Sequence, residues 1–199
     1  MKKIIFLISS STINLDNYNI KDISGSSGRL DVISRCILAS ILNVNKFEDI
    51  VQIWVFLNKY GSFLFDPNLL SYEIFPKNEI LLSDYLVDLL KTKTIEKGPI
   101  NNPLSSVIKS DLNIFEALNK LMQLNFDIYT LKEKGDDFFK FLPNIKRKRK
   151  IAFVIGSQTG DFINSEELNT LNFLNLSFGK KSYLASSVIR LIKYYLELV

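Results

Sequence analysis

The chain has 199 residues, of which 47% are hydrophobic and 23% are charged. This balance is typical of a folded globular chain and excludes an intrinsically disordered one. Basic residues exceed acidic residues by only four, so the charge permits a polyanionic partner without requiring one. Histidine is absent, which excludes Ser-His-Asp triads, cysteine–histidine pairs and histidine-containing zinc sites.

The first predicted element is a β-strand at residues 4–8, an apolar run that follows two lysines. A secretory signal peptide needs an apolar region of roughly 7–15 residues, and this run is shorter. No segment reaches the roughly 18 apolar residues of a membrane-spanning helix. The single cysteine, Cys36, has no partner for an internal disulfide and falls in an apolar segment. We therefore expect a soluble, cytoplasmic protein without a membrane partner.

A loop with two glycines, Gly25 and Gly28, leads into the next predicted helix. Asp31 and Arg35 are four residues apart, so they share one face of this helix. With Arg29 just before them, they predict a charged group that is presented rather than packed. The alternative is an ordinary surface ion pair, worth only about 0.3–0.5 kcal/mol. The apolar residues at helical spacing predict a buried stripe of Leu30, Ile33, Ile37, Ile41 and Val44.

The middle of the chain contains a predicted hairpin and a predicted helix. Residues 49–57 are β-branched and aromatic, and a Tyr-Gly turn leads them to a second strand at residues 62–65. Apolar residues recur at helical intervals over residues 79–90. Prolines, glycine and asparagines at residues 98–103 then predict a long irregular connection, open to motion or to a partner.

The second half of the chain alternates predicted strands with predicted helices. A helix at residues 112–124 is followed by strands at 127–131, 151–155 and 174–176, and a last helix begins at about residue 182. This alternation predicts an α/β fold in one domain, residues 1–199, with helices on both faces of a mainly parallel sheet. The predicted inward face of the last helix consists of Tyr183, Leu184, Ser187, Val188, Leu191, Ile192 and Tyr195.

Basic residues concentrate in the run Lys146-Arg147-Lys148-Arg149-Lys150, directly before a predicted strand. The run is interpreted as a contact with RNA phosphates. A solvated face and the protection of a sheet edge stay open as alternatives. Lys180 and Lys181 are the other candidates, because they adjoin a glycine-bearing turn.

The sequence Gly156-Ser-Gln-Thr-Gly160 directly follows a predicted strand. Without Cβ atoms, glycines allow main-chain amides to approach a ligand closely. The spacing matches neither the Gly-x-Gly-x-x-Gly dinucleotide motif nor the P-loop. Spacing alone therefore leaves two interpretations, a ligand-binding loop of another kind and a plain strand-ending turn.

Three blocks of sequence are distributed over nearly the whole chain: Asn19–Cys36, which contains Gly-Ser-Ser-Gly-Arg-Leu-Asp, then Phe153–Gly160 and Leu176–Ser186. In residues, order and separation these blocks resemble the archaeal tRNA (pseudouridine-54-N1)-methyltransferase family of the SPOUT superfamily. The resemblance implies a SPOUT fold with a deep trefoil knot at its carboxyl terminus. Such a knot is too rare to be proposed on any other ground.

The resemblance also implies a function: S-adenosylmethionine-dependent N1-methylation of pseudouridine 54 in the TΨC loop of tRNA, by a homodimer with no metal and no DNA partner. Two departures from the family pattern are visible. Ser186, Ser187 and Val188 stand where many relatives have His and Cys, and residues 107–109 replace a common arginine pair. Two alternatives therefore stay open: the same reaction on ribosomal RNA, and a non-catalytic RNA-binding or assembly factor.

Site residues follow from the resemblance by position. Asp31 is expected to orient the base edge or to accept its N1 proton, while Arg29 and Arg35 hold a phosphate or the uracil carbonyls. The implied cofactor residues are Leu131, Gly156, Gly160, Leu176, Ser177, Phe178, Gly179, Leu184 and Val188. The implied RNA contacts are Lys21, Arg29, Lys146, Arg147, Lys148, Lys180 and Lys181.

Overall fold

The structure is a computed structural model that describes residues 2–91, 102–156 and 162–198. In these ranges seven strands form one sheet: β1 (Lys3–Ser10), β2 (Val51–Leu57), β3 (Gly61–Phe65), β4 (Ile108–Ser110), β5 (Asp127–Asp137), β6 (Lys150–Ile155) and β7 (Leu174–Ser177). Their spatial order is β4-β3-β2-β1-β6-β5-β7. The neighbouring strands β2, β1, β6, β5 and β7 are parallel to one another. At the other edge, β3 pairs antiparallel with β2, and β4 pairs antiparallel with β3.

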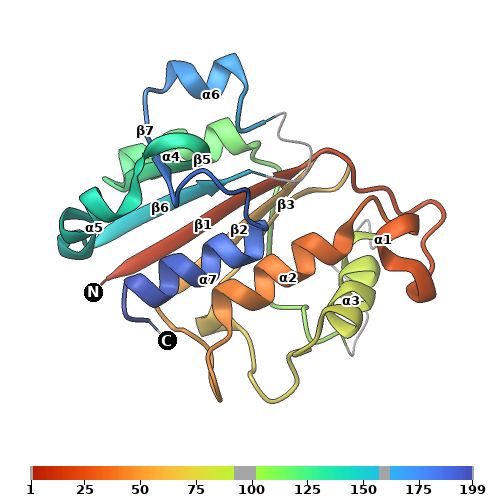
Figure 1. The fold of residues 1–199 in the computed structure, drawn as a ribbon. Coiled ribbons are helices and arrows are strands. Elements are labelled where there is room, and N and C mark those ends of the chain that lie inside the picture. The colour runs from red at the N-terminus through yellow and green to blue at the C-terminus, as the bar shows by residue number, and fades with distance from the viewer. Residues whose placement is uncertain (1, 92–101, 157–161, 199) are drawn as a thin grey trace.

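Helices cover both faces of this sheet (Figure 1). They are α1 (Ile23–Ser26), α2 (Leu30–Ile41), α3 (Glu79–Lys91), α4 (Ile114–Gln123), α5 (Phe138–Arg147), α6 (Glu166–Thr170) and α7 (Ala185–Tyr195), with 3-10 turns η1 (Ile20–Asp22) and η2 (Pro67–Leu69). The predicted α/β fold with a mainly parallel sheet is confirmed. Over the described ranges, none of the helices is long and apolar enough to cross a membrane.

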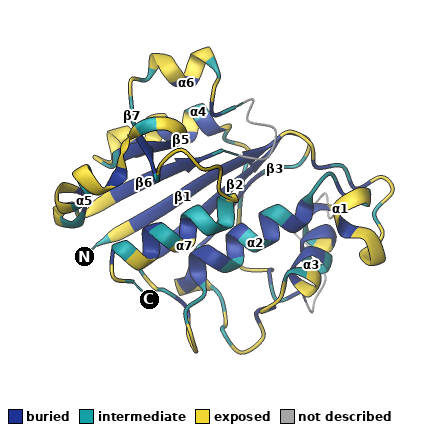
Figure 2. Cartoon of the chain, viewed as in Figure 1, coloured by how far each residue is buried: buried dark blue, intermediate teal, exposed yellow. Residues whose placement is uncertain are grey.

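The central strand β1 separates two apolar clusters. Its side chains alternate between the faces of the sheet, so Phe6 packs toward α2 and α7 while Leu7 packs toward α4. The Phe6 ring stacks on Phe153 of β6 at 5.8 Å, and Phe153 stacks on Tyr129 of β5 at 5.7 Å. Because both faces are covered, the strand is apolar from Ile4 to Ile8, as the sequence predicts for a buried parallel strand. Figure 2 shows this buried centre under exposed helix surfaces.

The inward face of α7 differs from the predicted one. Its buried residues are Ile189, Ile192 and Lys193, and the chain before the helix leaves Leu184 61% exposed. Tyr183 is exposed as well. Of the predicted face, Ile192 is buried and Val188 and Tyr195 are partly buried against the core, whereas Ile189 and Lys193 were not part of the prediction.

Lys193 is buried because it binds the end of another helix. Its amine donates hydrogen bonds to the main-chain oxygens of Ala39 at 3.1 Å and Leu42 at 2.7 Å, at the carboxyl end of α2. The last carbonyls of a helix have no partner within the helix, so a lysine amine is a suitable donor for them. Lys193 thereby joins α7 to α2 although it is only 2% exposed.

Other sequence predictions need correction. Val44 is 85% exposed because α2 ends at Ile41, so it lies outside the buried stripe. Helices α5 and α6 were not predicted, since Pro143 and a high density of charge interrupt the first of them. The basic run does not protect a sheet edge, because β6 lies between β1 and β5.

The predicted irregular connection lies mostly outside the described residues. At its described end, Asn102 is buried and its side-chain amide donates a hydrogen bond to the main-chain oxygen of Tyr85 at 2.9 Å. This end of the connection is therefore fixed to α3. The expectation of a partner-facing loop stays a prediction for the remainder.

The buried amine of Lys193 predicts a specific pH dependence of stability. Burial lowers the pKa of Lys193 from 10.5 to about 8, with nearby Glu48 opposing the shift and Arg190 adding to it. Between about pH 8 and 10.5 the unfolded chain binds more protons at this site, so the free energy of unfolding gains a rising contribution in that window. We expect Lys193→Met to lack this contribution. Urea unfolding of both proteins across the window measures it.

The control is Lys46→Met, since Lys46 is exposed in the loop after α2. This variant should keep the wild-type dependence on pH. Parallel stability profiles for wild type and Lys193→Met would contradict the expectation.

Candidate functional site

Three charged side chains meet at the start of α2. Arg29 donates from Nε and Nη2 to the two carboxylate oxygens of Asp31 at 3.0 and 3.1 Å, and Arg35 donates from Nη2 to Asp31 Oδ2 at 2.6 Å. Asp31 is only 8% exposed, whereas both arginines are half-buried. The carboxylate is therefore enclosed by the two guanidinium groups. The predicted grouping is confirmed, but Asp31 is not presented to solvent.

The loop before α2 is held in an unusual backbone conformation. Gly28 has φ +64°, and Arg29, a residue with a side chain, has φ +73°. A Cβ added to Gly28 would overlap the carbonyl oxygen of Thr12, so only glycine fits this close approach. The left-handed conformation costs a non-glycine residue roughly 1–3 kcal/mol. The paired hydrogen bonds from Arg29 to Asp31 help to offset this cost, and they raise the pKa of Arg29.

A fourth charged residue, Glu79, joins this cluster. Its Oε2 lies 3.4 Å from Arg35 Nε, and it is the first residue of α3. Ser34 and Ser83 are hydrogen-bonded at 2.7 Å and fix α3 against α2. The sequence analysis missed Glu79, because its contact depends on how two helices pack and has no local signal.

The predicted cofactor residues lie largely in one row across three neighbouring strands, at the carboxyl ends of β6 and β7 and at Leu131 within β5. Leu131 of β5 pairs with Ile155 of β6 on one side and with Leu176 of β7 on the other. Gly156, which follows Ile155, therefore lies in the same row. Parallel strands bring their carboxyl ends to one edge of the sheet, where ligands of open α/β sheets bind.

The turn after β7 is shaped by Ser177. Its hydroxyl accepts a hydrogen bond from the Gly179 N–H at 3.1 Å and lies 3.0 Å from the carbonyl oxygens of both Glu133 and Gly179. Gly179 has φ +111°, and a Cβ added there would meet no atom within 4 Å. The main chain of this turn therefore borders open space.

Three predicted cofactor residues stand apart from this edge or are used otherwise. The Phe178 ring packs against Phe138 of α5, with ring centroids 4.4 Å apart. Leu184 is exposed ahead of α7, and Val188 packs on the core from within α7. Gly160 lies outside the described residues.

The Arg29–Asp31–Arg35 cluster and the turn after β7 face the same edge of the sheet. Helices α2 and α7 lie side by side, and both begin at the edge where β1 ends (Figure 1). The first turn of α2 carries the arginine pair, and the segment that leads into α7 carries Gly179. The fold therefore brings two of the three sequence blocks together.

The predicted RNA-contacting residues divide into two groups. Lys146 binds Glu197 at 2.5 Å, and Lys148 binds Asp127 at 2.8 Å. The other predicted RNA contacts Lys21, Arg147, Lys180 and Lys181 are exposed and form no ion pair with a described residue. These four side chains can bind a phosphate without first leaving an acidic partner.

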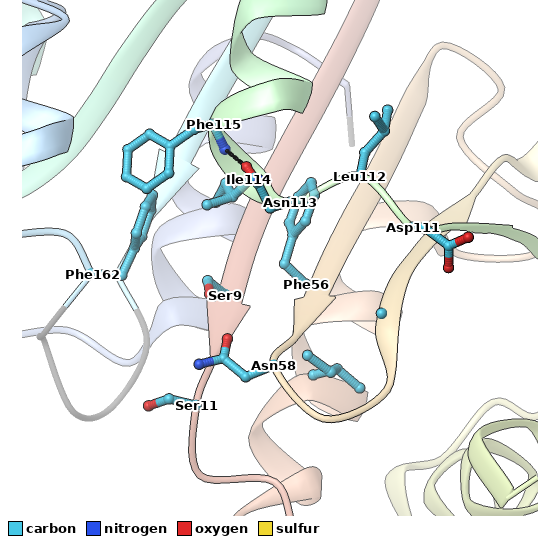
Figure 3. Close-up of a pocket in the computed structure, with 12 residues that line it drawn as sticks. Ser9, Ser11, Phe56, Asn58, Asp111, Leu112, Asn113, Ile114, Phe115 and Phe162 are labelled. Carbon is cyan, nitrogen blue, oxygen red and sulfur yellow. Dashed lines mark hydrogen bonds between the residues drawn. The ribbon is translucent and has the colours of Figure 1, made fainter.

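A cavity of about 490 Å³ opens beside this edge, and the sequence analysis did not find it. The ends of β1 and β2 and the residues directly after them line one side of the cavity. The start of α4 lines the other side (Figure 3). Its polar residues, such as Ser9 and Asn58, come from separate strands. No short motif connects them, so sequence spacing gave no signal.

Residues 1–198 match the family described as "Putative SAM-dependent RNA methyltransferase". The chain belongs to this family. Its members are described as S-adenosylmethionine-dependent, and the match covers nearly the whole chain.

Two relatives are similar to this RNA methyltransferase along almost all of their length. The tRNA (pseudouridine(54)-N(1))-methyltransferase of Pyrococcus abyssi is 27% identical, with 97% of each chain covered. The enzyme of the same name from Thermococcus gammatolerans is also 27% identical, with 91% of this chain and 90% of that one covered. The crystal structure of Archaeoglobus fulgidus Nep1 bound to S-adenosylhomocysteine has a TM-score of 0.62 and 17% identity, covering 99% and 98% of the chains. That likeness shows the shared fold.

The residues of the methyltransferase fit its cofactor at the carboxyl edge. An adenosyl group needs main-chain donors and acceptors, apolar surroundings and free space. The turn Ser177–Gly179 offers its main chain next to open space, and Leu131 and Leu176 form the apolar layer beneath. Both leucine side chains are buried, so a ligand at this row would contact main-chain N–H and C=O groups.

The close approach of Gly28 to Thr12 predicts that Gly28→Ala strongly destabilises the methyltransferase. Alanine at a positive φ is strained, and its Cβ must displace the main chain of Thr12. We expect a loss of more than about 1 kcal/mol in the free energy of unfolding. Gly179→Ala is the matched control, because it has a positive φ but no neighbouring atoms. Equal losses in chemical denaturation would contradict the role of the Thr12 contact.

Proposed function

We propose that this chain methylates N1 of pseudouridine at position 54 of tRNA, in the TΨC loop, with S-adenosylmethionine as methyl donor. One observation carries the proposal. The arginine–aspartate cluster lies at the same edge of the sheet as the turn after β7, in a chain that aligns along 97% of its length with the Pyrococcus abyssi enzyme of that name. S-adenosylmethionine, when bound, supplies the methyl group for attack by a ring nitrogen.

The proposed role of Asp31 is to position the two arginines. Its oxygens already accept three hydrogen bonds from Arg29 and Arg35, and it is almost fully buried. This positioning role differs from both roles expected from the sequence, which were orientation of the base edge and acceptance of the N1 proton. Carboxylates that hold a guanidinium in this way fix its plane, which gives the hydrogen bonds of its free N–H groups a defined direction.

Arg29 and Arg35 are proposed to bind the target nucleotide. Both side chains are half-buried and keep N–H groups that Asp31 does not occupy. Planar guanidinium groups form paired hydrogen bonds with phosphate oxygens or with the carbonyl oxygens of a uracil ring. Positioning the base in this way contributes to rate, because correct orientation removes much of the entropic cost of reaction.

The cofactor is proposed to lie along the ends of β5, β6 and β7. Main-chain groups of Gly156 and of Ser177–Gly179 would hold it, with Leu131 and Leu176 beneath. Gly160, Phe178, Leu184 and Val188 complete the set that the family resemblance implies. Leu184 is exposed directly before α7, so it is free to cover a ligand at this edge.

RNA phosphates are proposed to contact Lys180 and Lys181 first. Both follow the turn at Gly179, and both are exposed without an ion pair in the described residues. Lys21, Arg147 and Arg29 extend this basic surface. Lys146 and Lys148 have to leave their acidic partners before they bind RNA, so we expect smaller contributions from them.

A homodimer in the cytosol is part of the proposal. Exposed apolar and aromatic residues lie at both ends of α7: Tyr183 and Leu184 directly before it and Tyr194 in its last turn. Apolar surface of this kind is typical of protein–protein contacts. The one cysteine, Cys36, is fully buried, and burial raises its pKa to about 12, so it stays an unreactive thiol.

The proposed trefoil knot within one domain, residues 1–199, has support in the pairing of β5 and β7. Leu176 pairs with Leu131 and again with Asp136, so the intervening residues leave the strand and return to it. A Cβ on Gly135 would overlap the main chain of Asn175 and Leu176. The main chains of the two segments are thus in close contact, which is compatible with the proposed threading.

The decisive experiment measures transfer of labelled methyl groups to matched tRNAs with uridine or pseudouridine at position 54. We expect labelling that depends on pseudouridine and that is absent with a ribosomal RNA helix. Labelling of the ribosomal fragment instead would redirect the substrate. Binding of S-adenosylmethionine without transfer to either RNA would favour the non-catalytic assembly factor.

The proposed positioning role of Asp31 predicts the result of Asp31→Asn. An asparagine amide accepts fewer of the three arginine hydrogen bonds and carries no charge, so both guanidiniums lose their fixed orientation. We expect kcat/KM to fall by roughly 10²-fold or more, with the pH dependence of kcat unchanged. Asp49→Asn, at an exposed residue near the opposite end of the sheet, is the matched control. Loss of a titration step from the pH profile would identify Asp31 as the proton acceptor instead.

A further inference from the structure

The cavity beside the carboxyl edge has the chemistry of a nucleobase site. Its volume of about 490 Å³ is within the roughly 300–1,000 Å³ of small-ligand sites. Three aromatic rings line it, from Phe56, Phe115 and Phe162. Figure 3 shows Ser9, Ser11 and Asn58 grouped across from these rings. Aromatic surface for stacking next to short hydrogen-bonding side chains is the combination with which proteins bind unstacked bases.

The short polar side chains at this cavity are available to a ligand. Ser9 lines the cavity, and its hydroxyl makes no hydrogen bond with any described residue. The hydroxyl is accessible from the cavity, so it can bind the edge of a ligand in place of water. The side chains of Ser11 and Asn58 are also free to bind at the open side, since both are exposed.

The charges at the cavity exclude a phosphate as its occupant. No lysine or arginine is among the described residues of the lining, and Asp111 contributes a negative charge. The N-terminus of α4 is already capped, because Asn113 Oδ1 accepts the N–H groups of Phe115 and Glu116 at 2.9 and 3.0 Å. The Glu116 carboxylate adds a second negative charge at this helix start. A neutral ring fits this environment better than an anion does.

The cavity is distinct from the arginine cluster. Phe56, Phe115 and Phe162 belong to the apolar cluster on the α4 face of the sheet, whereas α2 and its arginines lie on the opposite face. Ile8 of β1 pairs with Ile155 of β6, so the cavity still adjoins the row that ends at Gly156. An RNA strand at this edge can therefore reach both places with different nucleotides.

We propose that this cavity binds an unstacked nucleobase of the RNA substrate other than the base that is methylated. The proposal rests on the proposed function, because it takes RNA as the substrate. The base would stack on Phe115 and Phe162 and would hydrogen-bond through its edge to Ser9 and Asn58. Binding a neighbouring base outside the stack would hold the strand open for the methylated one.

The test titrates the protein with a short single-stranded RNA and, separately, with S-adenosylhomocysteine. Trp54, the only tryptophan of the chain, lies with its ring 5.3 Å from Phe56 and reports on the cavity by fluorescence. Ser11→Phe blocks the open side from an exposed position, and Asn58→Ala removes an amide. We expect Ser11→Phe to weaken RNA binding roughly tenfold or more, and Asn58→Ala several-fold, with the affinity for S-adenosylhomocysteine unchanged.

Asn119→Ala is the matched control, because it removes an exposed amide of α4 outside the cavity. It should bind RNA as the wild type does. Unchanged RNA affinity in both cavity variants would overturn the inference and leave the proposed function intact. Loss of S-adenosylhomocysteine affinity would also overturn it, since the cavity would then hold the adenine of the cofactor. A wild type that binds no RNA would refute the proposed function itself.

Discussion

The parallel pairing of β1 with β2 on one side and β6 on the other is the constraint on which the rest of the structure depends. It joins the first strand of the chain to a strand that begins at Lys150. Because neighbouring strands point the same way, the loops that follow them meet at one edge. With the parallel pairing of β5 to β6 and to β7, this places the segment after β1, the row that ends at Gly156 and the turn after β7 at the same edge of the sheet.

The arginine–aspartate cluster shows how a local strain can be held by a charged group. Arg29 has a left-handed backbone, and its guanidinium is fixed by Asp31 two residues later. Gly28, in the same loop, packs directly against the main chain of Thr12. A loop of this kind has few alternative conformations, so its arginines are oriented before any ligand arrives.

Much of the fold could be predicted because apolar periodicity is a local property. The strands at residues 51–57 and 151–155 and the charged group at Asp31 are visible in the sequence itself. The burial of Asp31 was not predictable, since it depends on two arginines folding over it. The burial of Lys193 in α7 was not predictable for a related reason: its partners are carbonyls about 150 residues earlier. The cavity escaped detection because its walls come from separate elements.

The bond between Lys193 and the end of α2 has a consequence for how the chain folds. Its two hydrogen bonds span 154 and 151 residues, so the carbonyls of Ala39 and Leu42 gain this partner only when distant parts of the chain meet. Contacts between such distant residues slow folding, because a large loop must close before they form. The face of α2 that α7 covers is therefore buried only when that loop has closed.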